Sequence, residues 1–95
     1  MRVRYTPEAF ADRERFFDYL RERSPSGARN VMASIRDAVK LLRDQPNSGY
    51  KTNDPDVRVK FVIRYPYKIF YRARGETVEI AHIRHTSRRP WEGER

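Results

Sequence analysis

The fold is decided by residues 57–84, which read VRVKFVIRYPYKIFYRARGETVEIAHIR. Apolar and charged side chains alternate through this stretch, and a period of two predicts β-strands. Pro66 interrupts the alternation because proline cannot donate to a strand ladder, and Gly75 marks a tight turn. The sequence therefore predicts an antiparallel meander of three strands, over residues 57–64, 68–74 and 77–84.

The same alternation predicts which side chains share a face of the sheet. In the first strand the apolar side chains lie on one side and most basic ones on the other, and we expect the apolar side to pack on the helices. In the second strand, Phe70 opposes Ile69 and Tyr71. The expected inward set of the first strand is Val57, Val59, Phe61 and Ile63, its outward set is Arg58, Lys60, Val62 and Arg64, and in the third strand Val78 and Ile80 oppose Glu79, Ala81 and Ile83.

Two helices are predicted ahead of these strands. Thr6 and Pro7 are typical of a helix start, because threonine caps free N–H groups and proline suits the first helical position. Ser24 and Pro25 repeat the pattern, so one helix should run to about Arg23 and a second should follow it as an antiparallel neighbour. The expected apolar stripes are Phe10, Phe17 and Leu20 in the first helix, and Ala28, Val31, Met32, Ile35, Ala38, Val39 and Leu42 in the second.

The whole chain reads as a single α+β domain. Residues 1–5 also alternate, and this short strand must join the sheet because a lone strand is not stable. The order of elements predicts an N-terminal strand and a two-helix antiparallel hairpin packed on one face of a small antiparallel sheet of about four strands. At 95 residues, one domain spanning 1–95 is expected.

Composition excludes several classes of function. The chain has no cysteine, which excludes a disulfide scaffold, a thiol nucleophile and a Cys-ligated metal. Its two histidines have no matching carboxylate cluster, so neither a metal nor another cofactor is expected. No apolar run approaches the ~20 residues needed to cross a bilayer, and the N-terminus lacks the apolar run of a secretory signal. We therefore expect no membrane partner and a cytoplasmic location.

Basic charge is concentrated in the strand half. The net charge is +8, and residues 57–91 hold nine basic residues against two acidic ones. Cations on one open face repel one another unless an anionic partner neutralises them, so a surface for phosphates or carboxylates is favoured over a merely solvated face. The expected target-binding residues are Arg58, Lys60, Arg64, Arg72, Arg84, Arg88 and Arg89.

His85 is the candidate for proton transfer, because it ends the last strand beside Arg84 and histidine titrates near neutral pH. The alternative is a strand-end histidine that bonds a backbone carbonyl.

Three segments, taken in order, carry a family resemblance. They are Tyr5-Thr6-Pro7-Glu8-Ala9, then Tyr65-Pro66-Tyr67-Lys68-Ile69-Phe70-Tyr71-Arg72, then Val78-Glu79-Ile80-Ala81-His82-Ile83-Arg84-His85 with Thr86-Ser87-Arg88-Arg89-Pro90-Trp91 after it. Together they resemble the RelE/ParE superfamily of toxins from bacterial type II toxin–antitoxin modules, and the last strand is closer to ParE. The resemblance implies the fold described above, a cytoplasmic setting and a cognate acidic antitoxin.

The resemblance leaves the target open between two activities. A ParE-like chain would arrest growth by binding DNA gyrase, whereas a RelE-like chain would cut mRNA on the ribosome without a metal. Many RelE-like ribonucleases carry a tyrosine near the C-terminus, and here no tyrosine follows Tyr71, so His85 would have to replace it. In such a ribonuclease, Arg64 and Arg84 would stabilise the extra negative charge on the attacked phosphate. A third alternative, independent of the family, is a plain basic nucleic-acid-binding domain.

Overall fold

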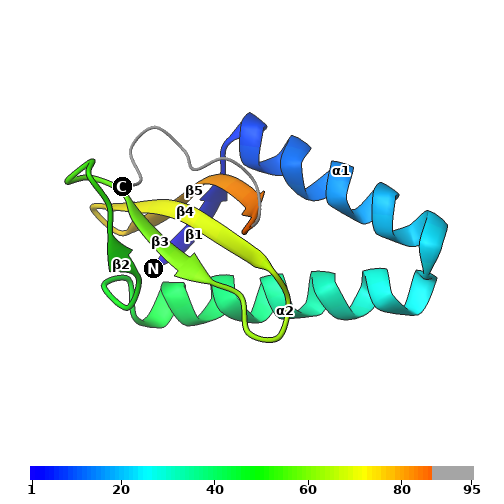
Figure 1. Ribbon diagram of the computed structural model, residues 1–95. Helices are drawn as coiled ribbons and strands as arrows, with labels where there is room; N and C mark the ends of the chain where they lie inside the picture. The colour runs from blue at the N-terminus through cyan, green and yellow to red at the C-terminus, as the bar shows by residue number, and fades with distance from the viewer. Residues whose placement is uncertain (87–95) are drawn as a thin grey trace.

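The structure is a computed structural model that describes residues 1–86, so the predicted target-binding residues Arg88 and Arg89 lie outside its described part. Within that part, two helices and five strands follow one another along the chain (Figure 1). Their bounds are β1 Arg2–Tyr5, α1 Pro7–Arg23, α2 Pro25–Asp44, β2 Tyr50–Lys51, β3 Arg58–Phe61, β4 Tyr67–Arg74 and β5 Thr77–His85.

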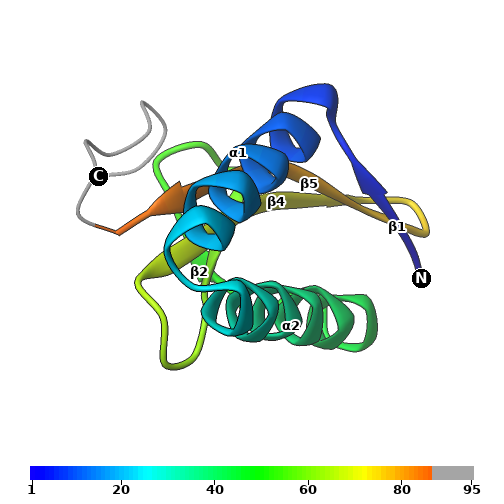
Figure 2. The same ribbon diagram turned by 90° about the vertical axis from the view of Figure 1, so that its right-hand side faces the viewer.

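The strands form one mixed sheet in the order β1-β5-β4-β3-β2. α2 lies below one face of the sheet, and α1 crosses beside β5 (Figure 2). The predicted α+β class, the helical hairpin and the antiparallel β3-β4-β5 meander are confirmed. The expected sheet of about four antiparallel strands differs in two respects. β1 pairs with β5 in parallel, and the predicted loop after α2 contributes the two-residue edge strand β2.

Both helices begin where the sequence predicts. The Thr6 hydroxyl accepts a hydrogen bond from the Ala9 N–H at 3.1 Å, and the Ser24 hydroxyl accepts one from the Gly27 N–H at 3.1 Å. These side chains satisfy N–H groups that have no partner within the first helical turn. Because the second cap follows α1 directly, the two helices are joined by one residue and fold back on each other.

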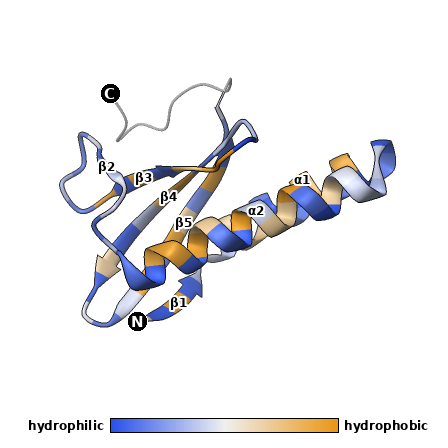
Figure 3. Cartoon of the chain, turned by 90° about the horizontal axis from the view of Figure 1, so that it is seen from below, coloured by the Kyte–Doolittle hydropathy of each residue, from blue (hydrophilic) through white to orange (hydrophobic). Residues whose placement is uncertain are grey.

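The main core lies between α2 and the sheet. Apolar residues recur along α2, where they are coloured orange in Figure 3. Ile35 and Leu42 of this stripe are almost completely buried and share the main core with Ile69 and Tyr71 of β4. The stripe predicted for α1 is partly wrong, because Phe10 is 50% exposed. α1 contacts β5, beside the centre of the sheet, and buries the narrower side that carries Ala9 and Asp12.

A polar edge joins α1 to β5, because β1 pairs with β5 only over residues 77–80. Beyond that point, the Thr6 hydroxyl donates to the Ala81 carbonyl at 2.9 Å, and the Asp12 carboxylate accepts from the Ile83 N–H at 3.0 Å. Side chains of α1 therefore supply bonds that a longer neighbouring strand would have supplied.

The faces of β5 differ from the predicted ones because the pairing of β4 with β5 is irregular. The pairing steps from Phe70 opposite His82 to Tyr71 opposite Ile80, so Ala81 is an extra residue. A β-bulge of this kind reverses the alternation beyond it. Ile83 therefore packs in the same core as Val78 and Ile80, and the prediction that it opposes them is wrong.

The predicted faces of β3 are reversed. Arg58 lies opposite Tyr71 and Lys60 opposite Ile69, so both basic side chains lie on the helix side. Val57 and Val59 instead form a second, smaller cluster with Phe70 on the outer face. Val62, which we placed outward, is buried in the main core, and Phe61 and Ile63, which we placed inward, are exposed. Residues 46–49, rather than a helix, lie beside the inner side of β3, which is why polar contacts replace apolar packing there.

Residues 46–49 also make a close contact with the buried Tyr71 of β4. The Tyr71 hydroxyl donates to the Pro46 carbonyl at 2.7 Å and accepts from the Gly49 N–H at 3.0 Å, and burial raises the pKa of Tyr71. A Cβ on Gly49 would lie 2.6 Å from the Tyr71 hydroxyl and 2.8 Å from the Val59 carbonyl oxygen. Tyr71 is fully buried, and the Val59 oxygen is backbone, so neither contact is easily relieved.

Gly49→Ala should therefore destabilise the domain by about 1–3 kcal/mol, the usual cost of overpacking a close-packed interior. Thermal unfolding checks this, with Gly75→Ala as the control. Gly75 has a φ of +58° but nothing within 4 Å of its Cβ position, so that change introduces backbone strain without a clash. Equal melting temperatures for Gly49→Ala and the wild type would contradict the packing argument.

Candidate functional site

A groove of about 730 Å³ lies at the end of the helical hairpin. The helices extend past the sheet (Figure 1), so the last turns of α1 and the first turns of α2 have no strands beneath them. The loop between β3 and β4 and the end of β5 form the opposite wall. The lining residues are Arg15, Phe16, Tyr19, Leu20, Arg23, Ser24, Gly27, Ala28, Val31, Tyr65, Pro66, Tyr67 and His85.

Aromatic side chains form one wall of the groove. The Tyr67 ring meets the Phe16 ring edge to face, with centroids 5.0 Å apart, and meets the His85 ring in the same way at 5.4 Å. Burial raises the pKa of Tyr67, so this side chain is neutral across the physiological range. An apolar, aromatic concave surface of this kind binds an apolar side chain from a partner.

Two arginines give the groove a cationic rim. The Arg23 guanidinium lies 3.6 Å from the centroid of the Tyr19 ring and donates to the Tyr19 carbonyl at 2.9 Å. Arg15 also lines the groove and pairs with the Asp12 carboxylate. The Arg15 side chain is 64% exposed. Arg23 is also exposed, and its hydrogen bond goes to a backbone carbonyl rather than to a carboxylate. Both guanidinium groups can therefore attract a further carboxylate.

The predicted cationic face of β3 is not an outer surface. Arg58 donates to the Gly49 carbonyl at 2.9 Å, and Lys60 lies 3.4 Å from the Ser48 hydroxyl. These contacts attach β3 to the segment that follows α2. The prediction that Arg58, Lys60 and Arg64 share the open face is wrong as to placement, and their role in target binding stays a prediction.

The outer face carries a different set of cations. Arg72 lies across from Glu79, with Nε 3.4 Å from a carboxylate oxygen, and Arg4 pairs with the same carboxylate. The hydrogen bond from Arg4 lowers the pKa of Glu79 below its ordinary value, so the pair persists at neutral pH. Farther along, Arg84 faces Lys68, and the Nε atom of Arg84 is buried without a hydrogen-bond partner among the described residues. The chain's own acid thus neutralises part of this face.

The three candidate catalytic residues do not converge. Arg84 and His85 are adjacent on β5, where successive side chains point to opposite faces. His85 pairs with Tyr67 on the groove side, and Arg84 pairs with Lys68 on the outer side. Arg64 lies in the loop between β3 and β4, exposed and with a φ of +76°.

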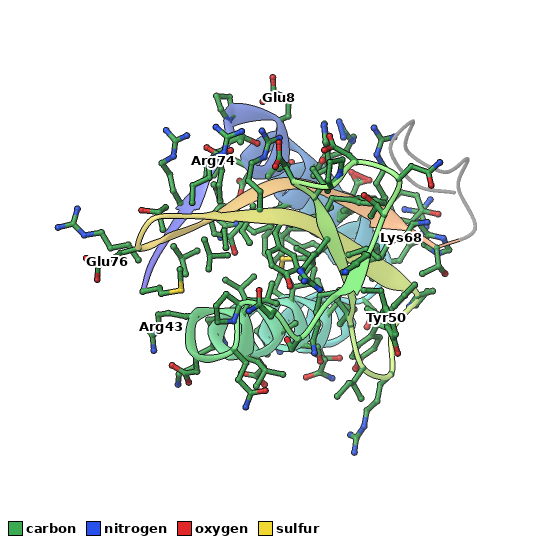
Figure 4. All side chains as sticks on the ribbon, turned by 90° about the vertical axis from the view of Figure 1, so that its left-hand side faces the viewer. Glu8, Arg43, Tyr50, Lys68, Arg74 and Glu76 are labelled. Atoms are coloured by element: carbon green, nitrogen blue, oxygen red, sulfur yellow. The ribbon has the colours of Figure 1, made fainter. Side chains whose placement is uncertain are left out.

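Exposed apolar side chains at the β2–β3 edge are a feature that sequence reasoning missed. We call this set, Tyr50, Phe61 and Ile63, the edge patch; their exposures are 68%, 45% and 77%. The Tyr50 and Phe61 rings meet edge to face at 5.9 Å. Tyr50 lies toward the Lys68 end of the sheet, away from the Arg74–Glu76 turn (Figure 4). Alternation alone placed Phe61 and Ile63 on the inward side. The signal in the sequence was Pro66, because a proline this close indicates that the strand ends early and that alternation stops predicting burial there.

Among residues 1–86, no three His, Asp or Glu side chains come together in a way that would hold a metal ion. Over the same residues, neither helix combines the length and apolar character needed to cross a bilayer.

Fold and surface together define a small basic α+β domain that offers an apolar groove with a cationic rim. Residues 3–90 match the family described as the ParE toxin of type II toxin-antitoxin system, parDE. The chain therefore belongs to the ParE toxin family.

Solved structures agree with the sequence match. One, described as the chromosomal ParDE TA system from P. aeruginosa, is 26% identical and superposes with a TM-score of 0.78. The alignment covers 92% of this chain and 97% of that chain. Among curated protein sequences, none matches this chain.

Proposed function

We propose that this ParE-family toxin acts in the cytoplasm by binding DNA gyrase, and that a cognate acidic antitoxin neutralises it by occupying the groove. The groove with its cationic rim is the observation that carries this proposal. Its walls come from the end of α1, the start of α2 and the loop between β3 and β4. One bound segment would therefore contact both the helices and the sheet.

The chemistry of the groove supports a specific kind of antitoxin segment. Phe16, Leu20 and Val31 offer apolar contacts, while Arg15 and Arg23 stand at the rim. The matching segment is an amphipathic helix with large apolar residues on one side and carboxylates beside them. Such a segment can be disordered when alone and fold on contact, which suits the neutralisation of a chain with a net charge of +8.

Binding, rather than RNA cleavage, has the better support. General acid–base cleavage needs its proton carrier and its cations around one phosphate. Here His85 points into the groove while Arg84 lies on the outer face, and Arg72 pairs with Glu79. The predicted partner Arg84 therefore does not lie with His85. The arginines that line the groove with His85 are already engaged, because Arg15 pairs with Asp12 and Arg23 lies over the Tyr19 ring.

The test presents the purified toxin with two substrates. With gyrase, supercoiled plasmid and ATP, we expect gyrase to be trapped on cleaved DNA and linear plasmid to accumulate. With translating ribosomes, we expect the mRNA to remain intact. The control is the toxin preincubated with its antitoxin, which should leave the plasmid supercoiled. Cut mRNA together with active gyrase would support the ribonuclease alternative. Tight, steeply salt-dependent binding to naked DNA without growth arrest would support the nucleic-acid-binding alternative.

A further inference from the structure

The edge patch is an exposed apolar surface at the margin of a small basic domain. Its three side chains come from β2, from the end of β3 and from the loop that follows β3. Ile63 is 77% exposed, more than any other large apolar side chain among the described residues. Isolated exposed apolar residues need no explanation. Here the Tyr50 and Phe61 rings contact each other, and the exposed Ile63 follows Phe61 by two positions, so the three together indicate a recognition surface.

The loop beside the patch is held in an unusual backbone conformation. Arg64 has a φ of +76°, the one non-glycine residue of the described part in the left-handed region. β-carbon sterics disfavour this region, and such residues cluster where a loop is shaped for binding. Here the conformation leaves both Ile63 and Arg64 exposed at the tip of the loop.

The charges around the patch point to an acidic partner. Arg64 follows Ile63 and Lys51 follows Tyr50, and both cations are exposed. Neither forms an ion pair among residues 1–86. A second copy of this chain fits poorly, because a two-fold interface places the same patch, and so the same cations, on both sides.

The patch and the groove use different residues of the loop between β3 and β4. Tyr65 and Pro66 line the groove, whereas Ile63 and Arg64 lie at the edge of the patch. A partner at the patch therefore does not need the residues that line the groove. A bulky antitoxin in the groove would nevertheless lie beside the patch, which offers a steric route to neutralisation.

We infer that the edge patch is the surface with which this toxin engages its protein target, an acidic surface with an apolar pocket for Ile63 and the two rings. The inference rests on the proposed function, because a toxin that acts by binding needs a target surface in addition to the antitoxin groove. Apolar anchors ringed by charge give such interfaces their affinity and their association rate.

The test separates target binding from antitoxin binding. Ile63→Asp places a carboxylate on an exposed loop, so the fold should survive while contact with an acidic surface is opposed. We expect growth arrest to be lost and toxin–gyrase affinity to fall at least about 30-fold, with antitoxin affinity unchanged. Phe10→Asp is the matched control, since Phe10 is half exposed on α1, outside both surfaces, and this variant should arrest growth like the wild type.

A second variant distinguishes a loss of target binding from a loss of folding. Arg64→Gly relieves the left-handed backbone and removes a cation, so its melting temperature should equal or exceed that of the wild type while toxin–gyrase affinity falls. Full growth arrest by both Ile63→Asp and Arg64→Gly would overturn the inference. Loss of antitoxin binding in Ile63→Asp would assign the patch to the antitoxin, and a wild-type dimer that dissociates in this variant would assign it to a second copy; either result overturns the inference.

The readouts also separate this inference from the proposed function. If the wild type arrests growth but leaves gyrase active, the choice of gyrase fails, and the growth of the Ile63→Asp strain still decides the role of the patch. If the wild type does not arrest growth, both proposals fail together.

Discussion

Replacing Tyr19 by aspartate should free this toxin from its antitoxin. Tyr19 is 55% exposed and lines the groove, with the Arg23 guanidinium against its ring. Aspartate at this position removes an aromatic contact. Its carboxylate can also form an ion pair with Arg23 and would repel the carboxylates of an acidic segment. Aromatic anchors at the centre of an interface typically contribute 2 kcal/mol or more, so we expect antitoxin affinity to fall by about 30-fold to 1,000-fold.

Co-expression and calorimetry test this prediction. A strain that carries the Tyr19→Asp toxin with the antitoxin should stop growing, whereas the wild-type pair should grow normally. An antitoxin concentration of 100 times the wild-type Kd stabilises the wild type by about 2.7 kcal/mol and should raise its melting temperature. The same concentration should stabilise the variant by about 0.9 kcal/mol or less, so the melting temperature of the variant should rise much less. Phe10→Asp, the same change on another part of α1, should remain fully neutralised. Normal neutralisation of Tyr19→Asp would place the antitoxin outside the groove.

Asp12→Ala should destabilise the domain by about 3 kcal/mol, since a buried N–H then loses a charged acceptor. The Asp12 carboxylate accepts from the buried Ile83 N–H at 3.0 Å, pairs with Arg15 and lies 3.5 Å from Nδ1 of His82. Alanine leaves the edge of β5 without a partner just where β1 has ended. For a domain of this size, such a loss lowers the melting temperature by about 12–24 °C.

Two variants divide the contributions of Asp12. Asp12→Asn keeps an oxygen that can accept from the Ile83 N–H and loses only the charge, so its loss should be about 1 kcal/mol. Arg15→Ala removes a mostly exposed ion pair, and its effect should be smaller still, below about 1 kcal/mol. Amide exchange at Ile83 provides a local readout and should be fastest in Asp12→Ala. Equal stability of Asp12→Ala and Asp12→Asn would contradict the role of the backbone contact.

Features that depend on local chemistry were predictable from the sequence. The two helix starts follow from Thr6-Pro7 and Ser24-Pro25, because capping uses residues three positions apart. The apolar stripe of α2 follows from its spacing, since one wide apolar side must find a core. The fold class and the ParE family resemblance rest on the order of such elements along the chain.

The candidate site was only partly accessible in this way. The strand meander was correct, yet the choice of which face of β3 meets the helices was reversed. Alternation states that Val59 and Arg58 point to opposite sides, but it does not state which side is covered. That choice depends on residues 46–49, whose carbonyls accept from Arg58 on the inner side.

The amino-acid order of this chain was enough to determine its two helices, their caps, every strand except β2, and the concentration of basic residues in the strand half. Each of these depends on neighbours within about one helical turn or one strand pair. The groove and the edge patch arise only when distant segments meet: a hairpin longer than its sheet, and β2 pairing with β3 beside the loop that contains Arg64. Likewise, only the bulge at Ala81 places His85, rather than Arg84, on the groove side. These features follow from how lengths and registers match across the fold, and a local pattern contains no information on that match.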